Sequence, residues 1–148
     1  YDHFTVVFEY ATGAKAFLQC RQTAGCQTGV IDDAFGTKGR CHLMQHKVEG
    51  AGGAWQYDGG DGIKSAYDRE HAELIQSIKA GRPINDAVRS AQSSLMAILG
   101  REAAYTGRRI TWKQIESAKL SLVPADLAWG PAPAGSDKVA VPGKYRLA

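Results

Sequence analysis

The sequence lacks the long apolar runs and the glycine motifs that identify several large classes of protein. A stretch of roughly 20 apolar residues would be needed to cross a bilayer, so the sequence predicts a soluble protein. The first residues show no basic start followed by an apolar stretch, which a signal peptide requires. Neither G-x-G-x-x-G nor G-x-x-x-x-G-K-[ST] occurs, so the glycines do not predict phosphate binding.

Cysteine and clustered positive charge are also scarce. The three cysteines, Cys20, Cys26 and Cys41, are too few and too widely spaced for a disulfide framework or a four-ligand zinc site. We expect buried free thiols and no metal. The net charge is +3, and Arg108-Arg109 is the only adjacent basic pair. Proteins that bind nucleic acid usually gather such charge on one face, so no nucleic-acid partner is expected.

The length and composition are typical of one globular domain. The chain has 148 residues, of which 44% are hydrophobic and 22% charged. We expect a single domain over residues 1–148, with 119–148 as an extended tail held down by Leu120, Leu122, Leu127 and Trp129. Four prolines interrupt any helical period in that tail: Pro124, Pro131, Pro133 and Pro142.

The first third of the chain predicts antiparallel strands. Phe4, Val6, Phe8 and Tyr10 alternate with more polar residues, and the Ala11-Thr12-Gly13 turn leads to a partner strand over 14–22. Further strands are expected over 28–32, 40–44 and 46–49, the second of them after a turn at 36–39. The glycine-dense stretch 50–62 predicts a loop around a short extension at 55–57.

Two helices follow, with clear start and stop signals. Ser65 and Asp68 indicate an N-terminal cap, and an apolar stripe then runs to Gly81: His71, Leu74, Ile75 and Ile78. A second helix is expected from Asn85 to Gly107, with an inner side formed by Val88, Ala91, Leu95, Ile98 and Leu99. Gly100 inside that helix predicts close packing, because glycine costs about 1 kcal/mol there relative to alanine. Thr111 and Gln114 predict a short third helix.

These elements predict the α/β class, as an α+β two-layer sandwich. The sheet is expected to be open-faced and mainly antiparallel, with two or three helices on one face. The opposite face carries Phe17 and polar neighbours. A bare face of this kind usually marks an interface, so we expect a homo-oligomer formed through the open sheet face.

The stretch from Tyr67 to Trp112, YDREHAELIQSIKAGRPINDAVRSAQSSLMAILGREAAYTGRRITW, carries a family resemblance. It resembles the carboxy-terminal domain of the Gfo/Idh/MocA oxidoreductases, in the branch of bacterial putative dehydrogenases. The N-terminal YDHFTVVFEYATGAKAFLQCRQTAGC, the GTKG turn and Leu-Ala-Trp-Gly-Pro at 127–131 fit the same branch. The resemblance implies an open-faced, mainly antiparallel sheet that forms the substrate-side wall and the oligomer interface.

The same resemblance implies a missing partner domain. Members of the family bind NAD or NADP in an amino-terminal Rossmann domain, and they carry a Glu-Lys-Pro segment and a catalytic histidine. None of these motifs occurs here, and the chain lacks an initiating Met, so we expect a piece of a longer protein. The piece alone should not catalyse and should hold no cofactor, because hydride transfer needs a positioned nicotinamide and an acid/base group. The parent's compartment, bacterial cytoplasm or periplasm, stays open.

Four residues are candidates for substrate binding. Arg21 and Gln22 end a strand, and the resemblance implies that the following loop lies near the substrate, where a guanidinium and an amide could hold sugar hydroxyls or a carboxylate. His71 and Tyr67 could line a pocket, although a histidine packed on the sheet and hydrogen-bonded to backbone is the favoured interpretation of His71.

Two function classes follow. The first is the substrate-side and oligomerisation domain of an NAD(P)-dependent oxidoreductase acting on a sugar, polyol or related hydroxyl compound, with an NAD-dependent glycosidase-like relative as a variant. The second is a non-enzymatic interaction module that assembles through its open sheet face.

Overall fold

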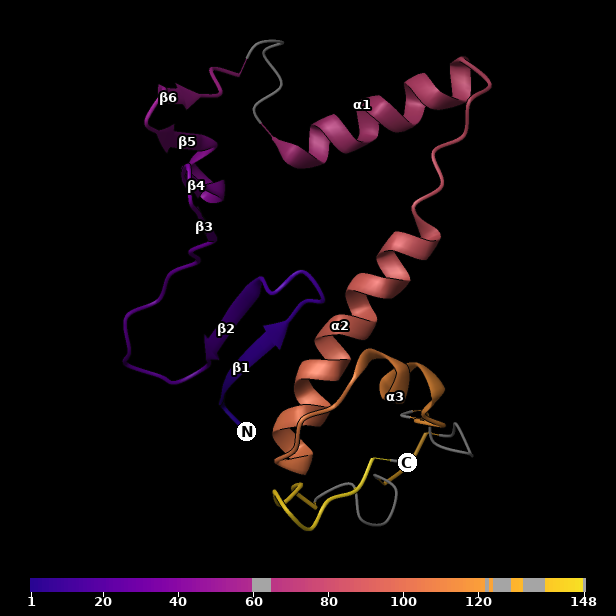
Figure 1. The fold of residues 1–148 in the computed structure, drawn as a ribbon. Helices are drawn as coiled ribbons and strands as arrows, with labels where there is room; N and C mark the ends of the chain where they lie inside the picture. Colours follow the sequence, from indigo (N-terminus) through magenta and orange to yellow (C-terminus); the bar gives the residue numbers. More distant parts are fainter. Residues whose placement is uncertain (60–64, 122, 124–128, 132–137, 148) are drawn as a thin grey trace. The chain divides into compact units, whose positions relative to one another are not determined.

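A computed structural model describes residues 1–59, 65–121, 123, 129–131 and 138–147. The chain divides into two compact units. The hairpin unit comprises Tyr1–Ala24 and Asp86–Ala148, and the sheet unit comprises Gly25–Asn85. Both are drawn in Figure 1. The mixed α/β class with open antiparallel sheets is confirmed, whereas the single domain stays a prediction.

The hairpin unit begins with two long antiparallel strands. β1 (His3–Glu9) pairs with β2 (Lys15–Arg21) in a register that places Phe8 opposite Ala16 and Val7 opposite Phe17. Gly13 has a φ of 85°, which turns the chain between the strands as predicted. Because side chains alternate across a strand, Val6 and Phe8 share one face and Val7 lies on the other.

Helix α2 (Ala87–Thr106) packs against the Val6 and Phe8 face of this hairpin. A Cβ placed on Gly100 would lie 3.0 Å from Cζ of Phe8 and 3.6 Å from Cγ1 of Val6. The predicted close packing at Gly100 is therefore confirmed. Phe8 is buried at this contact, and α2 ends at Gly107 with a left-handed φ of 66°.

α3 (Trp112–Ser117) and the described part of the tail both contact α2. α3 starts with the predicted capping box, in which Thr111 and Gln114 exchange hydrogen bonds. The described part of the tail docks nearby, because the Gly143 amide donates to the Thr106 carbonyl over 2.9 Å and Tyr145 packs edge-on against Tyr105.

The sheet unit holds four short strands in the order of the sequence. These are β3 (Asp33–Gly36), β4 (Gly39–His42), β5 (Lys47–Gly50) and β6 (Gly53–Gln56). A single 3-10 turn, η1 (Leu43–Gln45), links β4 to β5, and the other two connections are two-residue turns between glycines. The unit also contains α1 (Ala66–Lys79), whose Asp68 amide donates to the Ser65 hydroxyl as predicted.

Several expected boundaries differ from the structure. The strand predicted over 28–32 is wrong, because β4 ends at His42 and leaves no partner strand for residues before Asp33. The predicted loop extension at 55–57 is instead a full strand, β6. The second helix begins at Ala87 rather than Asn85, and its N-cap residue Asp86 forms an ion pair with Arg89.

The tail expectations are tested in part. Pro124, Pro133, Leu122 and Leu127 lie outside the described residues. Trp129 is fully exposed and does not anchor the tail, whereas Leu120 is partly buried. Pro131 and Pro142 lie outside helices and strands.

Candidate functional site

The β3–β6 sheet has two chemically different faces. One row of apolar side chains crosses all four strands of the first face: Ala34, Cys41, Val48 and Trp55. The next row on that face consists only of glycines: Gly36, Gly39, Gly50 and Gly53. This apolar face is open, since Trp55 is 58% exposed and Val48 is 43% exposed.

The second face of the same sheet is ionic. Glu49 accepts a hydrogen bond from Nε of Arg40 over 2.7 Å and is paired with Lys47. These two cations, with Lys47 the stronger influence, lower the pKa of Glu49 from 4.5 to about 2. Nδ1 of His42 lies 2.9 Å from a carboxylate oxygen of Asp33. The charged groups of this face therefore pair with one another, and Phe35, which is 77% exposed, is the large apolar side chain beside them.

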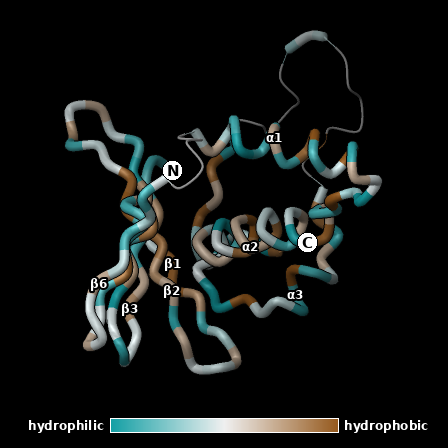
Figure 2. The backbone as a smooth tube through the Cα atoms, turned by 90° about the horizontal axis from the view of Figure 1, so that it is seen from above, coloured by the Kyte–Doolittle hydropathy of each residue, from teal (hydrophilic) through white to brown (hydrophobic). Residues whose placement is uncertain are grey.

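Two further apolar surfaces are exposed. On the outer face of the β1–β2 hairpin, Val7 and Phe17 form a cross-strand pair, and Phe17 is 71% exposed. This is the face for which the sequence predicts a partner. On α1, Leu74, Ile75 and Ile78 are exposed, although their spacing predicts burial. Apolar and polar segments alternate along α1 in Figure 2.

The four predicted substrate-binding residues are divided between the units. Arg21 is the last residue of β2, and the Gln22 amide donates to the Asp2 carbonyl over 2.7 Å. Tyr67 and His71 lie one turn apart on α1, where Nδ1 of His71 donates to the Tyr67 carbonyl over 2.7 Å. This bond confirms the backbone partner expected for His71, but His71 is exposed rather than packed.

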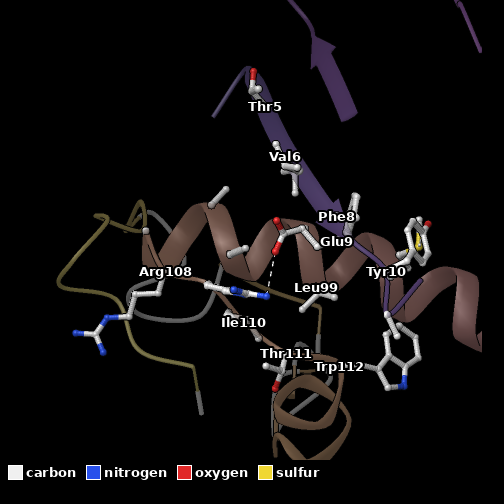
Figure 3. Close-up of a pocket in the computed structure, with 18 residues that line it drawn as sticks. Thr5, Val6, Phe8, Glu9, Tyr10, Leu99, Arg108, Ile110, Thr111 and Trp112 are labelled. Carbon is white, nitrogen blue, oxygen red and sulfur yellow. Dashed lines mark hydrogen bonds and ion pairs between the residues drawn. The ribbon is translucent and has the colours of Figure 1, made fainter. Parts of the chain in front are cut away.

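The hairpin unit contains a groove of about 710 Å³ (Figure 3). One wall is a continuous run of β1 and the following turn, residues 5–11. The opposite wall comes from α2, the segment that joins it to α3 and the first residue of α3, and it includes Met96, Leu99, Ile110 and Trp112. Arg109 reaches from that segment to Glu9, with Nη2 and Oε2 3.0 Å apart.

The sequence analysis did not predict a buried carboxylate in α2. Glu102 is fully buried, and its Oε1 accepts hydrogen bonds from Nε and Nη2 of Arg101 over 3.0 and 2.8 Å. The pKa of Tyr145 is raised, mainly because the residue is partly buried and secondly because of the neighbouring Glu102 carboxylate. The spacing of Glu102 from Leu95 and Leu99 follows the helical period of the inner side and could have revealed its position.

The thiols and charged groups give no further site within the described ranges. No disulfide joins Cys20, Cys26 and Cys41, and the expected burial is wrong for Cys20, which is exposed. Among the residues whose placement is described, no three His, Cys, Asp or Glu side chains are grouped as metal ligands. None of the described helices has both the length and the apolar character needed to cross a membrane.

Comparisons with protein-family models, curated proteins and solved structures find no match to this chain. The resemblance to the Gfo/Idh/MocA oxidoreductases thus stays a prediction from sequence, and the function is argued from the surfaces described above.

Proposed function

We propose that this chain is an assembly domain, and that it forms a homo-oligomer through the apolar face of the β3–β6 sheet. The observation that carries this proposal is the contrast between the two faces of that sheet. Ala34, Cys41, Val48 and Trp55 form a row without a charged side chain, and Gly36 and Gly53 beside it add no side chain that would hold a partner's backbone away.

The energetic argument rests on the exposure of large apolar side chains. Fully burying a valine side chain contributes about 1.5–3 kcal/mol, of which Val48, at 43% exposed, could still gain less than half. Trp55 is 58% exposed and, as an aromatic side chain, has more surface to bury. Two copies packed face to face would bury two such rows at once, as sheets do when they stack. The charged groups of the ionic face gain little from burial, because surface ion pairs contribute only about 0–1 kcal/mol each. Phe35, which is 77% exposed, is the large apolar side chain on that face.

Sedimentation velocity on the chain and two matched variants tests this assignment. Trp55→Lys places a charge on the apolar face, whereas Phe35→Lys places the same charge on the ionic face of the same sheet. We expect the unaltered chain and Phe35→Lys to sediment as oligomers, and Trp55→Lys to sediment as a monomer. An equal effect of both substitutions would reject the apolar face as the interface.

We further propose the specific form of this assembly domain. The resemblance supports the substrate-side and oligomerisation domain of an NAD(P)-dependent oxidoreductase that acts on a sugar, polyol or related hydroxyl compound. In this form the nicotinamide belongs to a separate Rossmann domain, and the chain alone is not the catalyst. Arg21 and Gln22, at the end of β2, would orient the substrate, with His71 and Tyr67 of α1 as further candidates.

NAD(P)H binding by the complete gene product tests the oxidoreductase form. The expected result is saturable binding, detected as a change in nicotinamide fluorescence. Substitution of Arg21 by alanine should then weaken substrate binding while leaving cofactor binding unchanged. Absence of NAD(P)H binding would reject this form without affecting the assembly role.

A non-enzymatic interaction module is the second candidate function. It is favoured by the same exposed apolar row, which is sufficient for assembly without any cofactor or substrate. The two candidates differ in one measurable property, because only the oxidoreductase form predicts that the complete gene product binds NAD(P)H.

A further inference from the structure

A second binding surface lies in the hairpin unit, and it is independent of the proposed assembly face. We infer that the groove beside β1 binds an extended peptide of a partner protein, which adds to the outer edge of β1 as a further strand and carries an acidic side chain toward Arg108 and Arg109.

The backbone of β1 offers the hydrogen bonds for such a strand. The Tyr10 amide donates to the Ala14 carbonyl over 3.0 Å, and the Gln22 amide donates to the Asp2 carbonyl over 2.7 Å. Hydrogen-bonded pairs alternate along an antiparallel ladder, so the even-numbered residues of β1 direct their amides and carbonyls toward β2. The odd-numbered residues direct theirs toward the other edge.

That outer edge is unoccupied by described backbone. Thr5, Val7 and Glu9 form no backbone hydrogen bond with another element among residues 1–59, 65–121, 123, 129–131 and 138–147. All three are exposed, and all three line the groove. A row of unpaired amides and carbonyls on an edge strand is a template for pairing with another chain.

The groove provides apolar contacts for the side chains of the incoming strand. Its lining includes Met96 and Leu99 of α2, Ile110 of the following segment and Trp112 at the start of α3. Leu99 and Ile110 lie across from β1 in Figure 3. In strand addition the backbone provides affinity and such side-chain pockets provide specificity. An alternating apolar pattern in the peptide fits this arrangement, because every second side chain would point toward α2.

The charge near the end of β1 selects an acidic peptide. Glu9 is the only carboxylate among the described residues that line the groove, and it already has two cationic partners, Lys15 at 3.2 Å and Arg109 at 3.0 Å. Arg108, next to Arg109 in the chain, adds a third positive charge, and its guanidinium points away from β1 in Figure 3. The three cations exceed the single negative charge of Glu9 by two. Arg109 is 82% exposed and can turn to a ligand carboxylate while Lys15 stays paired with Glu9.

Fluorescence anisotropy with short labelled peptides tests the inference on the unaltered chain. The probe is a blocked peptide of alternating threonine and valine, with glutamate at both ends and the length of β1, 7 residues. The control probe has lysine at both ends. We expect the glutamate peptide to bind about tenfold more tightly than the lysine peptide, in proportion to one or two charge-assisted contacts. Equal affinities, or no binding of the glutamate peptide, would overturn the inference.

Two substitutions at one position separate strand addition from simple apolar contact. Val7→Pro removes the amide that faces the outer edge, whereas Val7→Ala shortens the same side chain and keeps that amide. We expect Val7→Pro to weaken the glutamate peptide about tenfold relative to Val7→Ala. Equal binding by the two variants would contradict strand addition.

A charge variant keeps the test decisive if Val7→Pro fails to fold. Arg108→Glu should abolish the preference for the glutamate peptide, whereas Arg82→Glu, in the sheet unit, should preserve it. If Arg108→Glu leaves the preference unchanged, the inference fails. Self-association that Val7→Pro weakens, together with no peptide binding, would assign this edge to a second copy of the chain and also overturn the inference.

Discussion

Replacing Gly100 with alanine tests the packing of α2 on the hairpin. Alanine should stabilise a helix interior by about 1 kcal/mol relative to glycine. The new Cβ would lie 3.0 Å from Cζ of Phe8, tighter than ordinary van der Waals contact, and overpacking of a core typically costs about 1–3 kcal/mol. We therefore expect Gly100→Ala to destabilise the hairpin unit by about 0–2 kcal/mol.

The reasoning requires that the sign reverses when the phenyl ring is removed. In a Phe8→Leu background the Cζ atom is absent, so Gly100→Ala should stabilise the unit by about 1 kcal/mol. The double-mutant cycle should give a coupling energy of about 1–3 kcal/mol between the two positions.

Urea unfolding measures this coupling, with a probe confined to one unit. Of the three tryptophans, Trp112 reports on the hairpin unit when Trp55 and Trp129 are replaced by phenylalanine. This choice matters because two units can unfold in separate transitions. An identical stabilisation by Gly100→Ala in both backgrounds would refute steric contact between Gly100 and Phe8.

Three further substitutions address single features of the fold. Because the pKa of Glu49 is lowered from 4.5 to about 2, its ion pairs should stabilise the sheet above about pH 4.5 and lose this effect as the pH falls toward 2. The stability difference between the chain and Glu49→Gln, measured by thermal unfolding from pH 2 to 6, should shrink toward low pH, and a constant difference would contradict the pairing. Thr111→Ala should cost about 1 kcal/mol in urea unfolding through loss of the capping box, and no change would exclude that role. Gly39→Ala should disrupt the pairing of β4 with β5, because its Cβ would collide with the Glu49 carbonyl of β5; a native circular dichroism spectrum would argue against this geometry.

Local signals in the sequence predict much of this fold. The cap at Ser65, the capping box at Thr111 and the stop at Gly107 involve residues within one helical turn of each other, so their chemistry is readable from spacing alone. Gly100 is similar, since a glycine in the middle of a helix already indicates a close neighbour.

Which strands pair with one another could not be predicted from local spacing in the same way. The sequence predicts one sheet, whereas the strands form a hairpin and a separate four-stranded sheet, because residues 22–32 lack a strand to join them. The exposure of Ile75 and Ile78 also depends on which surfaces meet α1, and helical periodicity does not specify that.

For the candidate surfaces too, local features could be predicted from the sequence, whereas features that depend on strand pairing could not. Phe17 on an open face follows directly from strand alternation. The apolar row through Cys41 and Trp55 requires the register of four strands, which the glycine turns determine only once the pairing is known.

The alkylation rate of Cys41 tests the assembly face most directly. Cys41 lies within the apolar row of the sheet unit, whereas Cys20 lies on β2 of the hairpin unit and provides an internal reference. Both rates can be followed by mass spectrometry of the chain at increasing concentration. Assembly through the apolar face predicts that Cys41 reacts progressively more slowly while Cys20 reacts at a constant rate. A Cys41 rate that stays constant while the chain associates would contradict the account.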